Sequence, residues 1–146
     1  MNEVMSSNAK ILIVEDNADD AELLGRAFSK AGEEVALHFV RNGQEALDYL
    51  KGTNAFADRN VYPVPTLLLL DLRLPKIDGF EVIRWVRQEA GLRDLKIVVL
   101  SASGDRGDIA RAHGLGVNAY HVKPTDANAW AGMLEGLRTY WVEQTR

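Results

Sequence analysis

Cysteine is absent from the 146 residues, and no hydrophobic run is longer than four residues. Without cysteine the chain can form neither a disulfide framework nor a zinc–thiolate site, and it has no cysteine nucleophile. A helix that crosses a membrane needs about 20 consecutive apolar residues, so no membrane span is predicted. Positive charge is also in deficit, with 17 Lys and Arg against 21 Asp and Glu, which argues against nucleic-acid binding.

The beginning of the chain shows no targeting signal. Residues 1–9 lack a basic region followed by an apolar one, so they are interpreted as an N-terminal tail and not as a signal peptide. A hydrophobic fraction of 47% is enough for one packed core in a chain of this length. We therefore expect a cytoplasmic protein with a single domain over residues 10–146 and no output domain.

Short apolar runs predict three strands that are buried on both faces of a parallel sheet, over residues 11–14, 67–70 and 97–100. Two weaker strand patterns cover residues 34–40 and 118–123. Apolar residues at helical spacing predict helices between the strands. These helices span residues 19–30, 43–50, 78–89, 105–113 and 125–142. The long connection at residues 52–65 has a length typical of a functional or mobile loop.

Strand and helix thus alternate five times along the chain. This order predicts an α/β fold in which five helices cover both faces of a central five-stranded parallel sheet. Right-handed crossovers favour the strand order 2-1-3-4-5, which is the doubly wound, flavodoxin-like arrangement. Such sheets bind ligands beyond the carboxyl ends of the strands where the strand order reverses, here between strands 1 and 3.

Acidic residues gather at that predicted edge. Glu15 and Asp16 follow the first strand, and Asp71 follows the third. Neighbouring strands are about 4.8 Å apart, so the three carboxylates repel one another unless a cation lies between them. Oxygen ligands suit Mg²⁺ better than zinc. Helix capping by Asp16 and a turn at Asp71 explain each residue alone, but not their joint placement.

A hydroxyl group and an ammonium group end the last two predicted strands. Ser101 follows the fourth strand, and Lys123 ends the fifth. Lys123 lies two strand spacings from Asp71, or about 10 Å in backbone terms, which its long side chain largely covers. A cation, a lysine and a hydroxyl donor beside a carboxylate are what a phosphoryl group needs. Taken singly, a solvated lysine and a helix-capping serine remain the simpler interpretation.

Five segments at the strand ends together resemble a response-regulator receiver domain, the phosphorylated component of two-component signalling. The resemblance covers nearly the whole chain, and its segments are residues 13–17, 70–75, 78–79, 100–102 and 120–124. The long connection before the third strand and the tryptophan in the last helix are similar to the small, single-domain regulators that partner bacterial phytochromes.

The resemblance implies a metal site and a phosphoacceptor. Asp71 would accept a phosphoryl group from a sensor histidine kinase, of the phytochrome type. Asp71, Asp16 and the backbone carbonyl of Arg73 would bind Mg²⁺ directly, while Glu15 would act mostly through water. Ser101 would donate to a phosphoryl oxygen, and Lys123 would pair with the phosphoryl group, or with Asp71 before it arrives.

The resemblance also implies a switch. Tyr120 would turn inward on activation together with a shift at Ser101, and Pro124 would follow a cis peptide bond. The chain would not be an enzyme for other substrates: it would only take phosphoryl groups from small donors and lose them again. No cofactor besides Mg²⁺ is expected.

A homodimer is the expected assembly, through the face formed by the fourth helix, the fifth strand and the fifth helix. Tyr140 and Trp141 lie at the end of the predicted last helix, beyond the length of the sheet. Large aromatic side chains near the surface mark interfaces. We therefore expect these two residues to contribute to the dimer, and we expect neither nucleic acid nor a membrane as a partner.

Two other functions compete with this interpretation. A phosphatase of the haloacid-dehalogenase type also forms an aspartyl phosphate, but it needs a second aspartate two residues later, where Arg73 stands. A flavodoxin-like cofactor binder needs a Ser/Thr-rich phosphate loop after the first strand, where this chain has Glu15 and Asp16. Acetyl phosphate with Mg²⁺ separates the three classes, because only a receiver keeps one base-labile phosphoryl group.

Overall fold

Five parallel strands form one sheet in the order β2-β1-β3-β4-β5. The computed structural model describes residues 9–30 and 35–142, with side chains described as far as residue 140. The predicted flavodoxin-like fold is confirmed; residues 1–8 of the predicted tail and residue 34 of the second predicted strand lie outside the described part. The strands are β1 (Lys10–Val14), β2 (Ala36–Val40), β3 (Leu67–Leu70), β4 (Lys96–Ser101) and β5 (Ala119–Val122).

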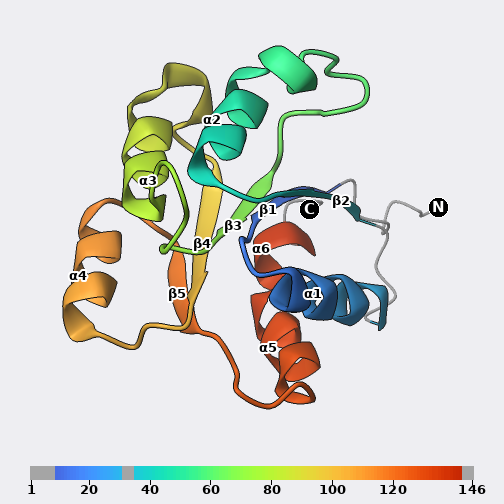
Figure 1. Cartoon of the computed structure of the whole chain (residues 1–146), viewed down its shortest axis with the longest axis vertical. Coiled ribbons are helices and arrows are strands. Elements are labelled where there is room, and N and C mark those ends of the chain that lie inside the picture. The colour runs from blue at the N-terminus through green and yellow to red at the C-terminus, as the bar shows by residue number, and fades with distance from the viewer. Residues whose placement is uncertain (1–8, 31–34, 143–146) are drawn as a thin grey trace.

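Helices cover both faces of this sheet (Figure 1). One face packs against α2 (Gly43–Lys51), α3 (Gly79–Gln88) and α4 (Arg106–Gly114). The other face packs against α1 (Ala18–Lys30) and α5 (Ala129–Leu137). The central strands are therefore buried on both sides, which explains why β1 and β3 are apolar at successive positions.

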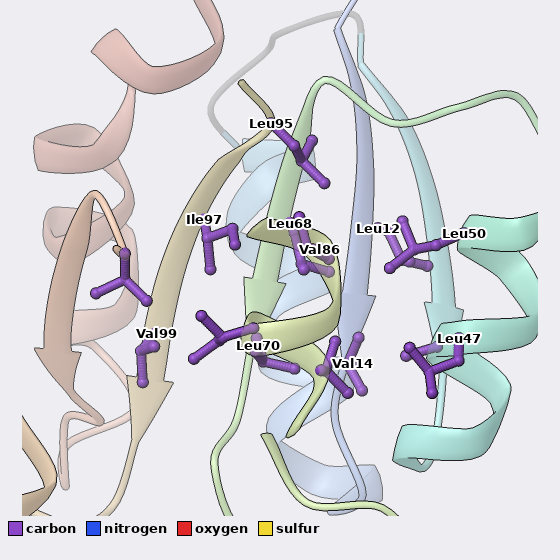
Figure 2. Packing of buried hydrophobic residues seen from close by; sticks show 14 of the residues in the cluster. Leu12, Val14, Leu47, Leu50, Leu68, Leu70, Val86, Leu95, Ile97 and Val99 are labelled. Atoms are coloured by element: carbon purple, nitrogen blue, oxygen red, sulfur yellow. The ribbon is translucent and has the colours of Figure 1, made fainter. Parts of the chain in front are cut away.

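Successive residues of each central strand belong to two different cores, as the pleat of a strand requires. Leu12 is in register with Leu68, and both face α2 and α3 (Figure 2). This core also contains Leu47 and Leu50 of α2 and Val86 of α3, which pack against the strand residues from the helix side. The opposite core joins the alternate strand residues to Leu24, Ala27 and Phe28 of α1 and to Trp130, Leu134 and Leu137 of α5.

Side-chain caps start all three helices on the first face, and Asp105 caps α4. Asn42 accepts a hydrogen bond from the Glu45 N–H at 2.8 Å, and Asp78 accepts one from the Glu81 N–H at 3.1 Å. Glu45 in turn accepts from the Arg41 N–H at 2.8 Å, so two otherwise free donors are satisfied at the start of α2. The caps of α2 and α3 fix where the chain turns back over the sheet after β2 and β3.

The last helix is shorter than predicted. Residues 125–142 do not form one helix; α5 begins at Ala129, and a separate short helix, α6 (Thr139–Val142), follows it. Before α5, the Asp126 side chain accepts from the Asn128 N–H at 2.9 Å, and the Asp126 carbonyl accepts from the Ala129 N–H at 2.9 Å. Such local bonds of Asp offer the backbone a turn in place of a helix.

Three further expectations toward this end of the chain are corrected or untested. Tyr140 does not stand free at the surface, because it packs partly buried against the core of α1 and α5. The side chain of Trp141 lies outside the described part of the structure. All peptide bonds between described residues are trans, including the bond before Pro124 that was expected to be cis.

The long connection at residues 52–65 is tied to α2 by side-chain contacts, although many of its residues are exposed. It contains a turn of 3-10 helix, η2 (Asn54–Phe56). Arg59 donates to the carbonyls of Tyr49 and Leu50 at the end of α2, each at 2.8 Å, and to the Tyr62 carbonyl at 2.9 Å. The rings of Tyr49, Phe56 and Tyr62 pack with centroids 5.1–5.9 Å apart.

Along the described residues, no helix combines the length and the apolar character that crossing a membrane requires.

Candidate functional site

Backbone pairing continues one residue past three strands and fixes three charged side chains at one edge of the sheet. The Glu15 N–H donates to the Val40 carbonyl at 3.0 Å, and the Asp71 N–H donates to the Val14 carbonyl at 3.1 Å. On the far side, the Lys123 N–H donates to the Ser101 carbonyl at 2.8 Å. The predicted convergence of these residues is thus observed for Glu15, Asp71 and Lys123.

The Lys123 ammonium lies at the centre of this edge. Its Nζ is 2.9 Å from Glu15 Oε1, 2.8 Å from Asp20 Oδ2 and 2.9 Å from Asp71 Oδ2. Only 10% of the Lys123 side chain is exposed, against 3% for Glu15, 22% for Asp20 and 9% for Asp71. An ammonium has three N–H donors, so each carboxylate accepts one of them.

Opposed effects set the pKa values of this cluster. Burial raises the pKa of Glu15 above its usual value, and the hydrogen bonds from Asn17 and Lys123 offset that rise only in part. Burial lowers the pKa of Lys123, but the hydrogen bonds to Asp20, Asp71 and Glu15 raise it by more. The net pKa of Lys123 is above its usual value, so the ammonium is charged throughout the physiological range.

The donors around Asp71 suit a hard cation, although they are not assembled as a metal site. Among the described residues, no three Asp, Glu, His or Cys side chains form a group that could hold a metal ion as placed. Glu15 and Asp71 both contact the Lys123 ammonium, because buried carboxylates require a compensating positive charge. Asp16, the next residue after Glu15, is exposed. Carboxylate oxygens are ligands that fit Mg²⁺ by type.

Ser101 and Tyr120 are linked through the loop after β4. Ser101 is fully buried, and its Oγ accepts from the Ser103 N–H at 3.1 Å. The Tyr120 hydroxyl donates to the Ser103 carbonyl at 2.8 Å, and its ring packs partly buried against the core on the face of the sheet that carries α4. Ser103 therefore connects Ser101 to Tyr120 by one hydrogen bond to each.

A second polar chain connects the loop of Asp71 to α4, and the sequence analysis missed it. Asp71 Oδ1 accepts from the Arg73 N–H at 3.2 Å. The Arg73 guanidinium lies 2.6 Å from Asp108, whose carboxylate also accepts from the Ser103 hydroxyl at 2.8 Å. No spacing in the sequence indicates this chain of contacts, because it joins the loop after β3 to the loop after β4 and to α4, and Arg73 and Asp108 are 35 positions apart.

Asp20 was also missed, although the sequence contains a signal for it. It lies four and seven residues before Leu24 and Ala27, on the face of α1 that packs against the sheet. A carboxylate on the apolar stripe of a helix needs a partner, because burial without one is costly. Here that partner is Lys123.

A sheet of this topology, with an acidic edge and a buried lysine after the fifth strand, defines the class of α/β receiver domains. The family model of the response regulator receiver domain matches residues 11–135. The chain belongs to this family and is a two-component response regulator.

Three relatives illustrate the similarity. The probable methanogenesis regulatory protein FilR2 of Methanothrix harundinacea is 37% identical over 136 residues, which cover 93% of this chain and 85% of FilR2. Response regulator Rcp1 of Synechocystis is 32% identical over 133 residues, covering 91% of this chain and 88% of Rcp1. The crystal structure of phosphorylated RcpA, a cyanobacterial phytochrome response regulator, superposes with a TM-score of 0.86 at 33% identity and covers 94% of this chain and 96% of RcpA.

A crystal structure of Rcp1 in its Mn²⁺-bound form superposes with a TM-score of 0.84 at 31% identity, covering 92% of this chain and 95% of that one. The resemblance to phytochrome-associated single-domain receivers is therefore confirmed. The phosphatase and the flavodoxin-like binder are not favoured.

Proposed function

We propose that Asp71 accepts a phosphoryl group from a sensor histidine kinase. The observation that carries this proposal is the placement of the Asp71 carboxylate at the sheet edge, 2.9 Å from a buried ammonium. One Asp71 oxygen attacks phosphorus, and the bond between phosphorus and the kinase imidazole nitrogen breaks, with its electron pair left on the imidazole. Lys123 then neutralises the phosphoryl oxygens, and the Ser101 hydroxyl donates to one of them.

Mg²⁺ is the proposed cofactor, held directly by Asp16, Asp71 and the backbone carbonyl of Arg73, with Glu15 acting mostly through water. When bound, it supplies positive charge that stabilises the negative charge developing on the phosphoryl oxygens. The Mn²⁺-bound form of Rcp1 supports a divalent cation in this family. Tyr120 is proposed to transmit the shift of Ser101 to the surface formed by α4, β5 and α5.

Replacing the nucleophile tests the central assignment. Asp71→Asn is expected to abolish phosphorylation by acetyl phosphate and Mg²⁺, because the amide is not a nucleophile and lacks the charge for the metal. The fold is expected to persist, because Lys123 keeps Glu15 and Asp20 as partners. Intact mass spectrometry measures the adduct, with the exposed Asp94→Asn as control. A full phosphoryl adduct on Asp71→Asn would refute the assignment.

A histidine kinase of the phytochrome type is the proposed partner. The relative RcpA supports it, since RcpA is a cyanobacterial phytochrome response regulator. The chain is proposed to act in the cytoplasm as a single-domain regulator. The chain is proposed to act only on its own Asp71, by gaining and losing a phosphoryl group, and not as an enzyme for other substrates. We expect phosphoryl transfer from a purified phytochrome kinase to be faster than phosphoryl transfer from an unrelated histidine kinase.

A homodimer through α4, β5 and α5 is the proposed assembly. This face offers surface for it, because no residue of β5 is fully buried and Ala112 is the one buried residue of α4. Val122, on this edge strand, is 49% exposed. With Tyr140 packed against the core, we expect Val122 to contribute more than the end of the last helix.

Sedimentation with and without acetyl phosphate measures this assembly. Val122→Lys is expected to yield monomers, because a charge on an edge strand opposes association. Val61→Lys is the matched control, since Val61 is 51% exposed but lies in the connection at residues 52–65. A wild type that is monomeric in both states would refute the dimer, and a dimer that survives Val122→Lys would place the interface elsewhere.

A further inference from the structure

The Lys123 ammonium has three carboxylate partners, although the proposed phosphoryl transfer requires only Asp71. Glu15 and Asp71 belong to the proposed Mg²⁺ site, whereas Asp20 lies on α1 outside it. Asp20 is nevertheless as close to Nζ as the other two, at 2.8 Å. This contact joins residues 103 positions apart in the chain, so it is a product of the fold and not of local sequence.

Local hydrogen bonding leaves the Asp20 carboxylate available for this contact. Asp20 is the third residue of α1, where an acidic side chain commonly bonds back to the N–H of the capping residue. Here the N–H of the capping Asn17 donates to Glu15 Oε2 at 3.0 Å instead. The Asn17 side chain accepts from the Asp20 N–H at 3.0 Å, which holds the start of α1 in place.

Burial reduces the screening of this ion pair relative to an ordinary surface pair. The side chains of Asp20 and Lys123 are 22% and 10% exposed, so water screens their attraction only in part. Leu24 and Phe28 anchor α1 in the core, which fixes the distance of Asp20 from the end of β5.

We propose that Asp20 is a positioning residue, which holds Lys123 beside the site when Glu15 and Asp71 are engaged by Mg²⁺. The inference rests on the proposed function. A divalent cation between those two carboxylates repels the ammonium, since like charges at this range oppose each other strongly. Of the three carboxylates that contact Lys123, Asp20 is the one that lies outside the proposed metal site, so it keeps Nζ within reach of a phosphoryl group on Asp71.

A double-mutant cycle on Mg²⁺ affinity tests this role, with titration calorimetry on the whole chain and no phosphoryl donor. In Asp20→Asn the ammonium is left to Glu15 and Asp71 and competes better with the metal, so affinity falls about tenfold. In a Lys123→Met background, Asp20→Asn is expected to have no more effect than the exposed control Asp19→Asn. An equal loss in both backgrounds would mean that Asp20 acts only as a distant negative charge, and would overturn the proposal.

A second measurement does not depend on the folding of Lys123→Met. At saturating Mg²⁺, Asp20→Asn is expected to slow phosphorylation by acetyl phosphate about fivefold, a loss typical of coupled neighbours. Asp20→Glu restores the rate, and Asp19→Asn matches the wild type. If Asp20→Asn is phosphorylated as fast as the wild type, the positioning role of Asp20 is overturned, but the proposed function is not. A wild type that acquires no phosphoryl group overturns the proposed function itself, so the two failures are distinguishable.

Discussion

Gly79 lies where the first turn of α3 meets the loop that carries Asp71. Its N–H donates to the Leu72 carbonyl at 2.9 Å. A Cβ at this position would stand 2.6 Å from the Asp71 carbonyl oxygen and 2.7 Å from Leu72 Cα. Both neighbours are backbone atoms, so a side chain at residue 79 has to displace the loop that positions the nucleophile.

Gly79→Ala is therefore expected to lower the free energy of unfolding by about 1–3 kcal/mol, the usual cost of overpacking. It is also expected to slow phosphorylation of Asp71. Gly132→Ala is the control, because no atom lies within 4 Å of its Cβ in the middle of α5. Alanine there is expected to stabilise the helix by up to about 1 kcal/mol. Urea denaturation measures both, and equal effects would contradict this account of Gly79.

At the scale of the elements, Arg59 ties the connection at residues 52–65 to the end of α2. Gly52 ends that helix with a φ of 71°, a left-handed conformation that favours glycine. A Cβ on Gly52 would also meet the Arg59 guanidinium at 2.7 Å. The three carbonyls that Arg59 binds include two at the carboxyl end of α2, where unpaired acceptors accumulate in any helix.

Arg59→Met is expected to destabilise the protein by about 2 kcal/mol, because hydrogen bonds from a charged donor are lost together. Cleavage by a protease within residues 52–65 is expected to become faster, since the connection loses its tie to α2. Arg93→Met, at an exposed arginine, is the control. Limited proteolysis followed by mass spectrometry locates the cleavage sites. Unchanged cleavage in Arg59→Met would show that Arg59 does not hold the connection to α2.

The central strands were predictable because burial on both faces demands apolar residues at successive positions, as in residues 11–14 of β1 and in β3. Parallel strands place their carboxyl ends at the same edge of the sheet, so the sequence predicts that Glu15, Asp71 and Lys123 lie close together, as they do. The start of α5 was not predictable from periodicity, because the turn at Asp126 depends on local side-chain bonds that leave the apolar pattern unchanged.

At the scale of the whole molecule, Mg²⁺ is expected to raise the thermal midpoint of unfolding. A ligand of the folded state alone stabilises by about 2.7 kcal/mol at a hundredfold excess over its Kd. Asp16→Asn is expected to remove most of the shift, because Asp16 is the exposed carboxylate that Lys123 does not engage in its three ion pairs. Calorimetry at constant ionic strength with Na⁺ as control measures it, and a midpoint insensitive to Mg²⁺ would contradict the proposed site.

The charged edge is contributed by segments spread along the chain, with Asp20 and Asp71 lying 103 and 52 positions before Lys123. Chains leave the ribosome from the N-terminus onward. A nascent polypeptide that has emerged only as far as β4 already carries its carboxylates, but their counter-ion is still inside the exit tunnel. The charged edge can therefore be completed only when the last strand has emerged, and we expect chains that terminate before β5 to lack all three ion pairs of Lys123.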